Sequence, residues 1–117
     1  MSAESVIHPL AAALVAGRAY TDVAPSGVAL PFIVYQQVGG NGLVYAEGDL
    51  PNRENARMQI ACWAKTRLQA IGLAQQIEAL MCASELQAIP LGARVSIYEE
   101  DTLRYGSRQD FSTFALR

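Results

Sequence analysis

The sequence predicts an α+β fold, with a mostly antiparallel sheet of about four strands and two helices packed on one face. Two segments, 2–17 and 66–83, repeat their apolar residues at three- and four-residue steps, which predicts helices. Other segments alternate apolar and polar residues or contain short β-branched runs, which predicts strands. The order is α-β-(β)-β-α-β-β, and the last two strands are joined by a short link, which favours an α+β arrangement. The chain has 117 residues, of which 51% are apolar and 17% charged. We therefore expect one domain, residues 1–117, with a real hydrophobic core.

The first helix is expected between Ser2 and Gly17. Its apolar face is marked by Val6, Leu10, Ala13 and Leu14. Pro9 removes a hydrogen bond inside a helix, so the helix either begins near His8 or bends at the proline. Gly17 is a suitable residue to end it.

The next segment combines one clear strand with two long loops. Residues 18–31 contain proline and glycine breakers and are expected to form a loop. Phe32 to Val38 is a β-branched and aromatic run and is expected to form a strand. Gly39 to Gly42 must be a turn or a mobile loop, because few residues accept positive φ as readily as glycine. Leu43 to Ala46 could add a short strand.

The clearest strand signal runs from Asn55 to Ala64. One face is expected to meet the core: Met58, Ile60, Cys62 and Ala64. The opposite, more polar face carries Arg57, Gln59, Ala61 and Trp63. The large apolar ring of Trp63 on that face needs a separate explanation.

The second helix is predicted over Thr66 to Ala83, where Thr66 and Gln69 match a capping box. Its apolar stripe is Leu68, Ile71, Ala74 or Gln75, Ile77 or Glu78, and Met81, widened by Leu73 and Leu80.

A loop over residues 84–92 and two strands, Ala93 to Tyr98 and Arg108 to Leu116, complete the prediction. The link between those strands, residues 99–107, contains Gly106 as a turn signal.

Composition excludes several classes of protein. The net charge is −2, whereas a free-standing nucleic-acid-binding domain normally carries a basic field. No apolar run approaches the roughly 20 residues of a membrane helix. Leu10 to Ala16 follows Glu4 and His8 rather than a basic segment, unlike a signal peptide. We expect a soluble cytoplasmic domain without a membrane partner.

The sequence offers no catalytic constellation, cofactor motif or metal site. Gly39 to Gly42 follows a strand as phosphate-binding turns do, but neither a helix nor a lysine comes after it. The acidic residues 99–101 lack the alternate spacing of a calcium loop and are interpreted as a solvated turn. Cys62 and Cys82 are interpreted as small buried hydrophobes. A nucleophilic cysteine needs a histidine partner, and the only histidine of the sequence is His8, in the N-terminal segment.

The sequence does offer candidate residues for a protein–protein contact. Arg57 and Trp63 share the outward face of one strand, with Tyr35 and Tyr45 expected nearby, and such residues are common interface anchors. We therefore select Arg57, Trp63, Tyr45 and Asn41 as candidate interface residues. A helix or loop covering that face within one chain would explain Trp63 equally well. The ratio of eight arginines to one lysine suits interfaces, but a GC-rich genome produces it too.

Three segments carry a resemblance to a known family. They are LPFIVY at residues 30–35, RMQIACWA at residues 57–64 and RQDFS at residues 108–112, with an Ala- and Leu-bearing helix between the last two. In this order they resemble the small phage tail-completion proteins of prophages and gene-transfer agents, long catalogued as a domain of unknown function. The resemblance spans nearly the whole chain.

The resemblance implies an α+β subunit related to the tail terminators of long-tailed phages. Such proteins form a ring, typically hexameric, on the tail tube, where they stop polymerisation of the tube protein and offer a surface to the head connector. A head–tail connector or stopper subunit is the alternative. The resemblance supplies no catalytic residue and no cofactor, and it implies assembly in the host cytoplasm followed by residence in the virion tail.

Overall fold

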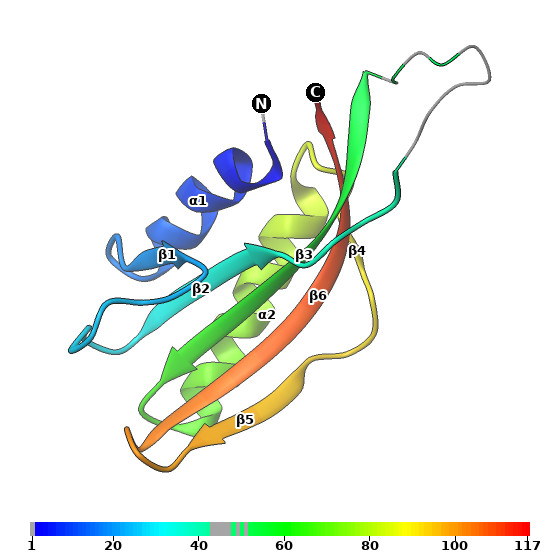
Figure 1. Ribbon diagram of the computed structural model, residues 1–117. Coiled ribbons are helices and arrows are strands. Elements are labelled where there is room, and N and C mark those ends of the chain that lie inside the picture. The colour runs from blue at the N-terminus through cyan, green and yellow to red at the C-terminus, as the bar shows by residue number, and fades with distance from the viewer. Residues whose placement is uncertain (1, 43–47, 49, 51) are drawn as a thin grey trace.

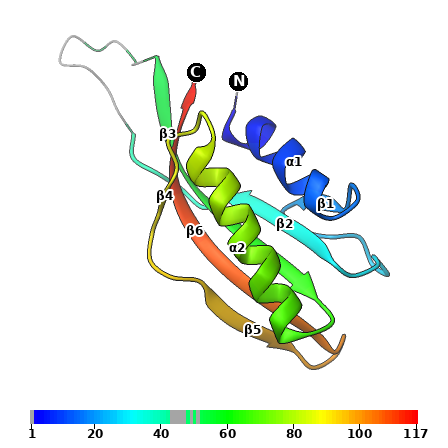
Figure 2. The ribbon, with the colours of Figure 1, turned by 180° about the vertical axis from the view of Figure 1, so that it is seen from behind.

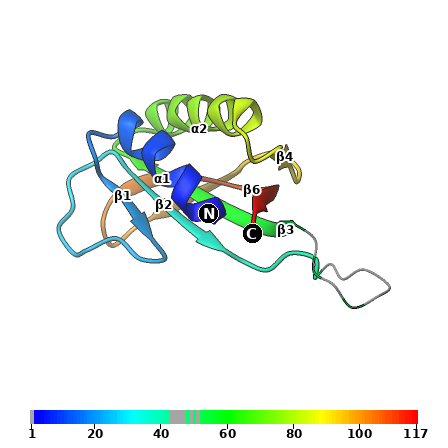
Figure 3. The same ribbon diagram turned by 90° about the horizontal axis from the view of Figure 1, so that it is seen from above.

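The computed structural model describes residues 2–42, 48, 50 and 52–117. In this part of the chain two helices cover one face of a six-stranded sheet (Figures 1 and 3). The elements are α1 (Ala3–Leu14), β1 (Ala19–Thr21), β2 (Phe32–Gln37), β3 (Arg53–Ala64), α2 (Arg67–Ala83), β4 (Ile89–Pro90), β5 (Val95–Glu99) and β6 (Arg104–Leu116).

The sheet is mixed rather than purely antiparallel. Its order is β1-β2-β3-β6-β4, and β5 also pairs with β6. β1 runs parallel to β2, and the other pairs are antiparallel. The predicted α+β class, with two helices on one face, is confirmed.

The expectation of about four strands is wrong for the described residues, which form six. β1 lies inside the predicted loop 18–31, and β4 inside the predicted loop 84–92. Both strands are very short and depend on pairing with a longer strand far along the sequence, so neither produces a local pattern. The possible strand at Leu43 to Ala46 lies outside the described residues.

Helix α1 begins at Ala3, six residues before Pro9. Ser2 caps it: the Ser2 hydroxyl accepts from the Ser5 amide and the Ser5 hydroxyl accepts from the Ser2 amide, both at 3.2 Å. The helix therefore starts at Ala3 and contains Pro9, so a start near His8 is wrong. The chain leaves the helix through Ala16 and Gly17, which both have positive φ, as expected of a C-terminal glycine stop.

The buried stripe of α1 is shifted from the predicted one. The buried residues of this segment are Ala3, Ile7, Ala11 and Val15, spaced by four residues. Three residues of the predicted stripe, Val6, Leu10 and Leu14, are partly buried beside the core, whereas Ala13 is exposed. Alanine gives weak contrast between the faces of a helix, so sequence alone placed the stripe one position off.

Helix α2 confirms the predicted segment and one half of its cap. The Thr66 hydroxyl accepts from the Gln69 amide at 3.1 Å, but the Gln69 side chain accepts from the amide of Lys65, not that of Thr66. Leu68 is 82% exposed, so its place in the stripe is wrong. The buried residues of the helix are Ala70, Leu73, Ala74, Ile77 and Met81.

Strands β3 and β6 pair along their whole length and form the centre of the sheet. Ala64 lies opposite Tyr105, and Arg53 lies opposite Leu116. The predicted core face of β3 (Met58, Ile60, Cys62 and Ala64) is buried, as expected. β6 begins at Arg104, four residues before the predicted start, because Gly106 stands inside the strand rather than in a turn.

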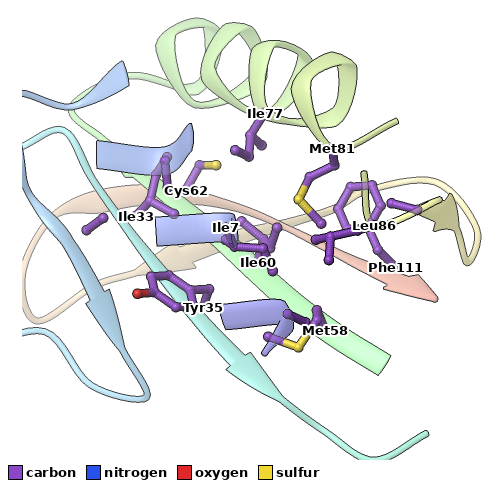
Figure 4. Close-up of a cluster of buried hydrophobic side chains, with 14 of the residues drawn as sticks. Ile7, Ile33, Tyr35, Met58, Ile60, Cys62, Ile77, Met81, Leu86 and Phe111 are labelled. Atoms are coloured by element: carbon purple, nitrogen blue, oxygen red, sulfur yellow. The ribbon is translucent and has the colours of Figure 1, made fainter. Parts of the chain in front are cut away.

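The core lies between the helices and one face of the sheet (Figure 4). It draws on both helices, on β2, β3 and β6, and on the segment after α2. Its labelled members are Ile7, Ile33, Tyr35, Met58, Ile60, Cys62, Ile77, Met81, Leu86 and Phe111. Buried Gln109 adds a polar link, because its side-chain amide donates to Glu78 of α2 at 2.8 Å. Neither described helix is long and apolar enough to cross a membrane.

The two cysteines occupy different environments. Cys62 is buried, as predicted, but Cys82 is exposed, so the prediction that it is buried is wrong. Cys82 lies next to buried Met81 near the end of α2, on the side of the helix that faces solvent. Burial raises the pKa of the Cys62 thiol to about 12, which keeps it protonated near neutral pH.

We therefore expect one thiol of the native protein to react with a disulfide reagent at neutral pH. The thiolate is the reacting species, so Cys62 is protected both by its raised pKa and by lack of access. Cys82→Ser should abolish the native reaction, and denaturant should expose Cys62 in that variant. A rapid reaction of native Cys82→Ser would contradict the buried position of Cys62.

Candidate assembly surface

The face of the sheet opposite the helices is not covered by any described helix (Figures 1 and 2). Register places Trp63 opposite both Phe32 of β2 and Gly106 of β6, and these three residues share this open face. Arg57 and Asp110 lie on the same face farther along the strands. The open face therefore combines aromatic rings with charged side chains.

Trp63 forms a stack with residues from two neighbouring strands. The guanidinium carbon of Arg104 lies 4.8 Å from the centre of the Trp63 ring and 5.1 Å from that of Phe32. These distances fit cation–π contacts, which favour arginine over lysine because the planar guanidinium can lie on a ring. The contacts leave Trp63 only 9% exposed.

Gly106 makes room for this ring. A Cβ built on Gly106 would lie 2.8 Å from a carbon of the Trp63 ring. Any larger residue at position 106 would push the tryptophan off the sheet. Gly106 therefore allows β6 to pack closely against the Trp63 ring of β3 and does not form a turn.

Arg104 is also tied to the β5–β6 turn, which comprises residues 100–103. Its guanidinium forms an ion pair with Glu99 at 2.9 Å, and the Thr102 hydroxyl donates to the same Glu99 oxygen at 2.7 Å. The hydrogen bond from Thr102, together with Arg104, holds the pKa of Glu99 below its usual range. Both ends of the turn are thus fastened to one carboxylate.

A shallow hollow of about 280 Å³ lies beside the stack, and we name it the tryptophan hollow. Its apolar lining comes from Val23, Ala24, Phe32, Val34, Ala61, Trp63 and Ile97. Its polar lining comes from Asp22, Gln36, Gln59, Arg104 and Arg108. A lining that mixes apolar and charged side chains suits an organic group better than it suits a metal ion.

The structure brings two of the sequence-selected residues together elsewhere on the molecule. Arg57 and Asn41 line a second, more polar hollow with Asn55. Arg57 pairs with Asp110 at 2.8 Å, and the Asn41 amide donates to the Asn55 side chain at 2.8 Å. Gly40 is required beside them, since a Cβ there would lie 2.6 Å from the Asn55 carbonyl oxygen.

The other selected residues do not join this group. Trp63 is six positions from Arg57 along β3, a separation of about 20 Å in a strand. Tyr35 faces the helices and is 3% exposed, so the expectation that it lies near Trp63 on the outward face is wrong. Strand alternation explains this, because Tyr35 pairs with Ile60 of the core face. Tyr45 lies outside the described residues.

Sequence reasoning missed Phe32, Arg104 and Gly106 as partners of Trp63. Arg104 and Gly106 were assigned to a link between strands, which hid their alternation with Arg108 and Asp110. Extending the period-2 pattern of β6 back through Gly106 would have placed them on the face of Trp63.

The described residues contain no group of three His, Cys, Asp or Glu side chains able to hold a metal ion. His8 is exposed on α1, and its Nδ1 lies 2.8 Å from the Tyr35 hydroxyl. Burial, and then the charge of Glu4, raises the pKa of Tyr35, so the phenol remains protonated at neutral pH and can donate this hydrogen bond. The contact fastens α1 to β2.

The chain is a two-layer α+β domain whose open sheet face carries aromatic and arginine side chains. The family model described as "Tail completion protein gp17" matches residues 8–115. The chain therefore belongs to this family of phage tail-completion proteins. Comparison with curated proteins gives no match.

Proposed function

We propose that this chain is a tail terminator. Several copies, six in the expected form, assemble as a ring on the end of the tail tube. The ring stops polymerisation of the tube protein and presents a surface to which the head connector binds. The family match over residues 8–115 is the observation that carries this proposal.

The open face supports a role in assembly. A closed ring needs two different patches on each subunit, because head-to-tail contacts repeat one unlike pair of surfaces. The tryptophan hollow is a candidate for one such patch, and the polar hollow beside Arg57 and Asn41 is a further, separate feature of the surface. We propose Arg57, Asn41, Trp63 and Tyr45 as contact residues, with Trp63 acting mainly by holding Arg104 in place.

The charge of the protein is compatible with a ring through which DNA passes. The net charge is −2. A strongly basic wall would bind the phosphate backbone and retain DNA that must slide. The proposed role therefore includes neither specific nucleic-acid binding nor a cofactor or catalysis.

Deleting the gene from a phage or prophage that carries it should give tails of uncontrolled length without attached heads. Electron microscopy of the lysate measures both properties, and supplying the gene in trans should restore normal particles. Tails of correct length beside separate heads would indicate a connector or stopper instead. Normal infectious particles from the deletion would contradict both roles.

Light scattering of the purified protein over a wide concentration range tests the ring directly. A hexamer, or growth toward one with concentration, supports the proposal. A tight dimer at every concentration would count against it, since a closed two-fold contact uses the same patch on both subunits.

A further inference from the structure

Arg108 stands at the margin of the tryptophan hollow without a charged partner. It is exposed, and it forms neither a hydrogen bond nor an ion pair with the described residues, whereas Arg57 and Arg104 on the same face are paired. A guanidinium beside an apolar hollow suits an incoming apolar side chain that is accompanied by a carboxylate.

The β5–β6 turn of the same protein has that chemistry. Glu100 and Asp101 are exposed and form no ion pair with the described residues, and Leu103 follows them with 69% of its surface exposed. The contacts of Glu99 with Thr102 and Arg104 hold the turn in one conformation, which lowers the entropic cost of binding. The exposure of Leu103 shows that it does not fill the hollow of its own chain.

We propose that the tryptophan hollow of one copy receives the β5–β6 turn of a second copy. Leu103 enters the hollow, and the carboxylates of Glu100 and Asp101 face Arg108. The inference rests on the ring proposed above and names the two unlike surfaces that meet in it. Contacts of this kind, turn to hollow, propagate from subunit to subunit.

The acidic residue in the lining of the hollow, Asp22, fixes the direction of entry. Asp22 follows β1, which is separated from β6 by β2 and β3, a distance of about 14 Å at the usual strand spacing. The acidic residues of the turn therefore approach from the side of Arg108, away from Asp22. Asp22→Asn should not weaken the contact, and it serves as the matched control.

Cross-linking between copies tests the proposed contact. Two chains are prepared in a Cys82→Ser background, one with Leu103→Cys and the other with Gln36→Cys, a residue of the hollow. Mixing them over a wide concentration range with a short thiol cross-linker should give an adduct of two chains that neither chain gives alone. Absence of this adduct at every concentration would overturn the inference.

Charge reversal tests the role of Arg108. Arg108→Glu in the Gln36→Cys chain should lower the adduct yield about tenfold or more, because like charges then meet. Adding Glu100→Arg and Asp101→Arg to the Leu103→Cys chain should restore the yield. An unchanged yield with Arg108→Glu, or no restoration by the reversed turn, would contradict the pairing.

The failure of this inference can be told apart from the failure of the proposed ring. A hexamer in light scattering without the adduct would leave the ring standing and place its interface elsewhere. An adduct together with tails of normal length after gene deletion would show that copies associate but do not terminate tails.

Discussion

Trp63→Ala is expected to lower the free energy of unfolding by about 3–5 kcal/mol, the usual cost of truncating a large buried aromatic side chain. Trp63 is 9% exposed, although no described helix covers its face. Removing the ring leaves a void over Gly106 and takes away one of the two aromatic contacts of Arg104. Equilibrium unfolding in urea, with an unchanged m-value, measures the loss.

Trp63→Phe is the control for this substitution. It keeps an aromatic ring for Arg104 and should cost markedly less than alanine. The same variants separate two roles of Trp63. If Trp63 acts by positioning Arg104, Trp63→Phe keeps the proposed ring assembly, whereas a folded Trp63→Phe protein that does not assemble would indicate direct contact by the indole. A loss below about 1 kcal/mol for Trp63→Ala would contradict the structural role argued here.

Phe111→Ala is expected to cost about 3–5 kcal/mol as well, for a different reason. Phe111 is fully buried on the helix side of β6, where it lies opposite Met58 of β3 and Pro90 of β4. The cavity would open at the centre of the core, between the sheet and α2. For a domain whose total stability is about 5–15 kcal/mol, this loss unfolds a large part of the population on mild heating.

Phe114→Ala is the matched control, because it removes the same side chain from the same strand. Phe114 is only partly buried and lies on the open face, opposite Asn55. Its truncation should cost clearly less than that of Phe111. Equal losses in thermal unfolding would contradict the assignment of the two faces of β6.

The sequence predicts the elements of this fold best where the pattern is strong and local. The alternation of residues 55–64 predicted both faces of β3, and the apolar run beginning at Phe32 predicted β2. Both helices were placed correctly. Most of the buried stripe of α2 was predicted, since Leu73, Ala74, Ile77 and Met81 are buried. The stripe of α1 was displaced, because alanine-rich faces differ little in hydrophobicity. The strands β1 and β4 escaped prediction, since so few residues form a strand only when a longer partner already provides the hydrogen bonds.

The candidate site could be predicted only in part. The outward direction of Arg57 and Trp63 follows from strand alternation alone, and the structure agrees. The partners Arg104 and Gly106 of Trp63 follow from the register of β3 with β6, which joins residues more than forty positions apart and cannot be derived from either segment. Gly106 illustrates the difficulty: it reads as a turn, but the ring of Trp63 occupies the space where another residue would place its Cβ.

The position of β6 has a consequence for how the chain folds during synthesis. β6 is the last strand in chain order, yet it lies between β3 on one side and β4 and β5 on the other. β3, β4 and β5 are therefore synthesised before β6, the strand that pairs with all three. Until β6 is made, the backbone groups along one edge of β3 have no partner strand. We expect a nascent chain halted before Arg104 to stay protease-sensitive and to depend on chaperones, so only chains translated through β6 reach the folded state.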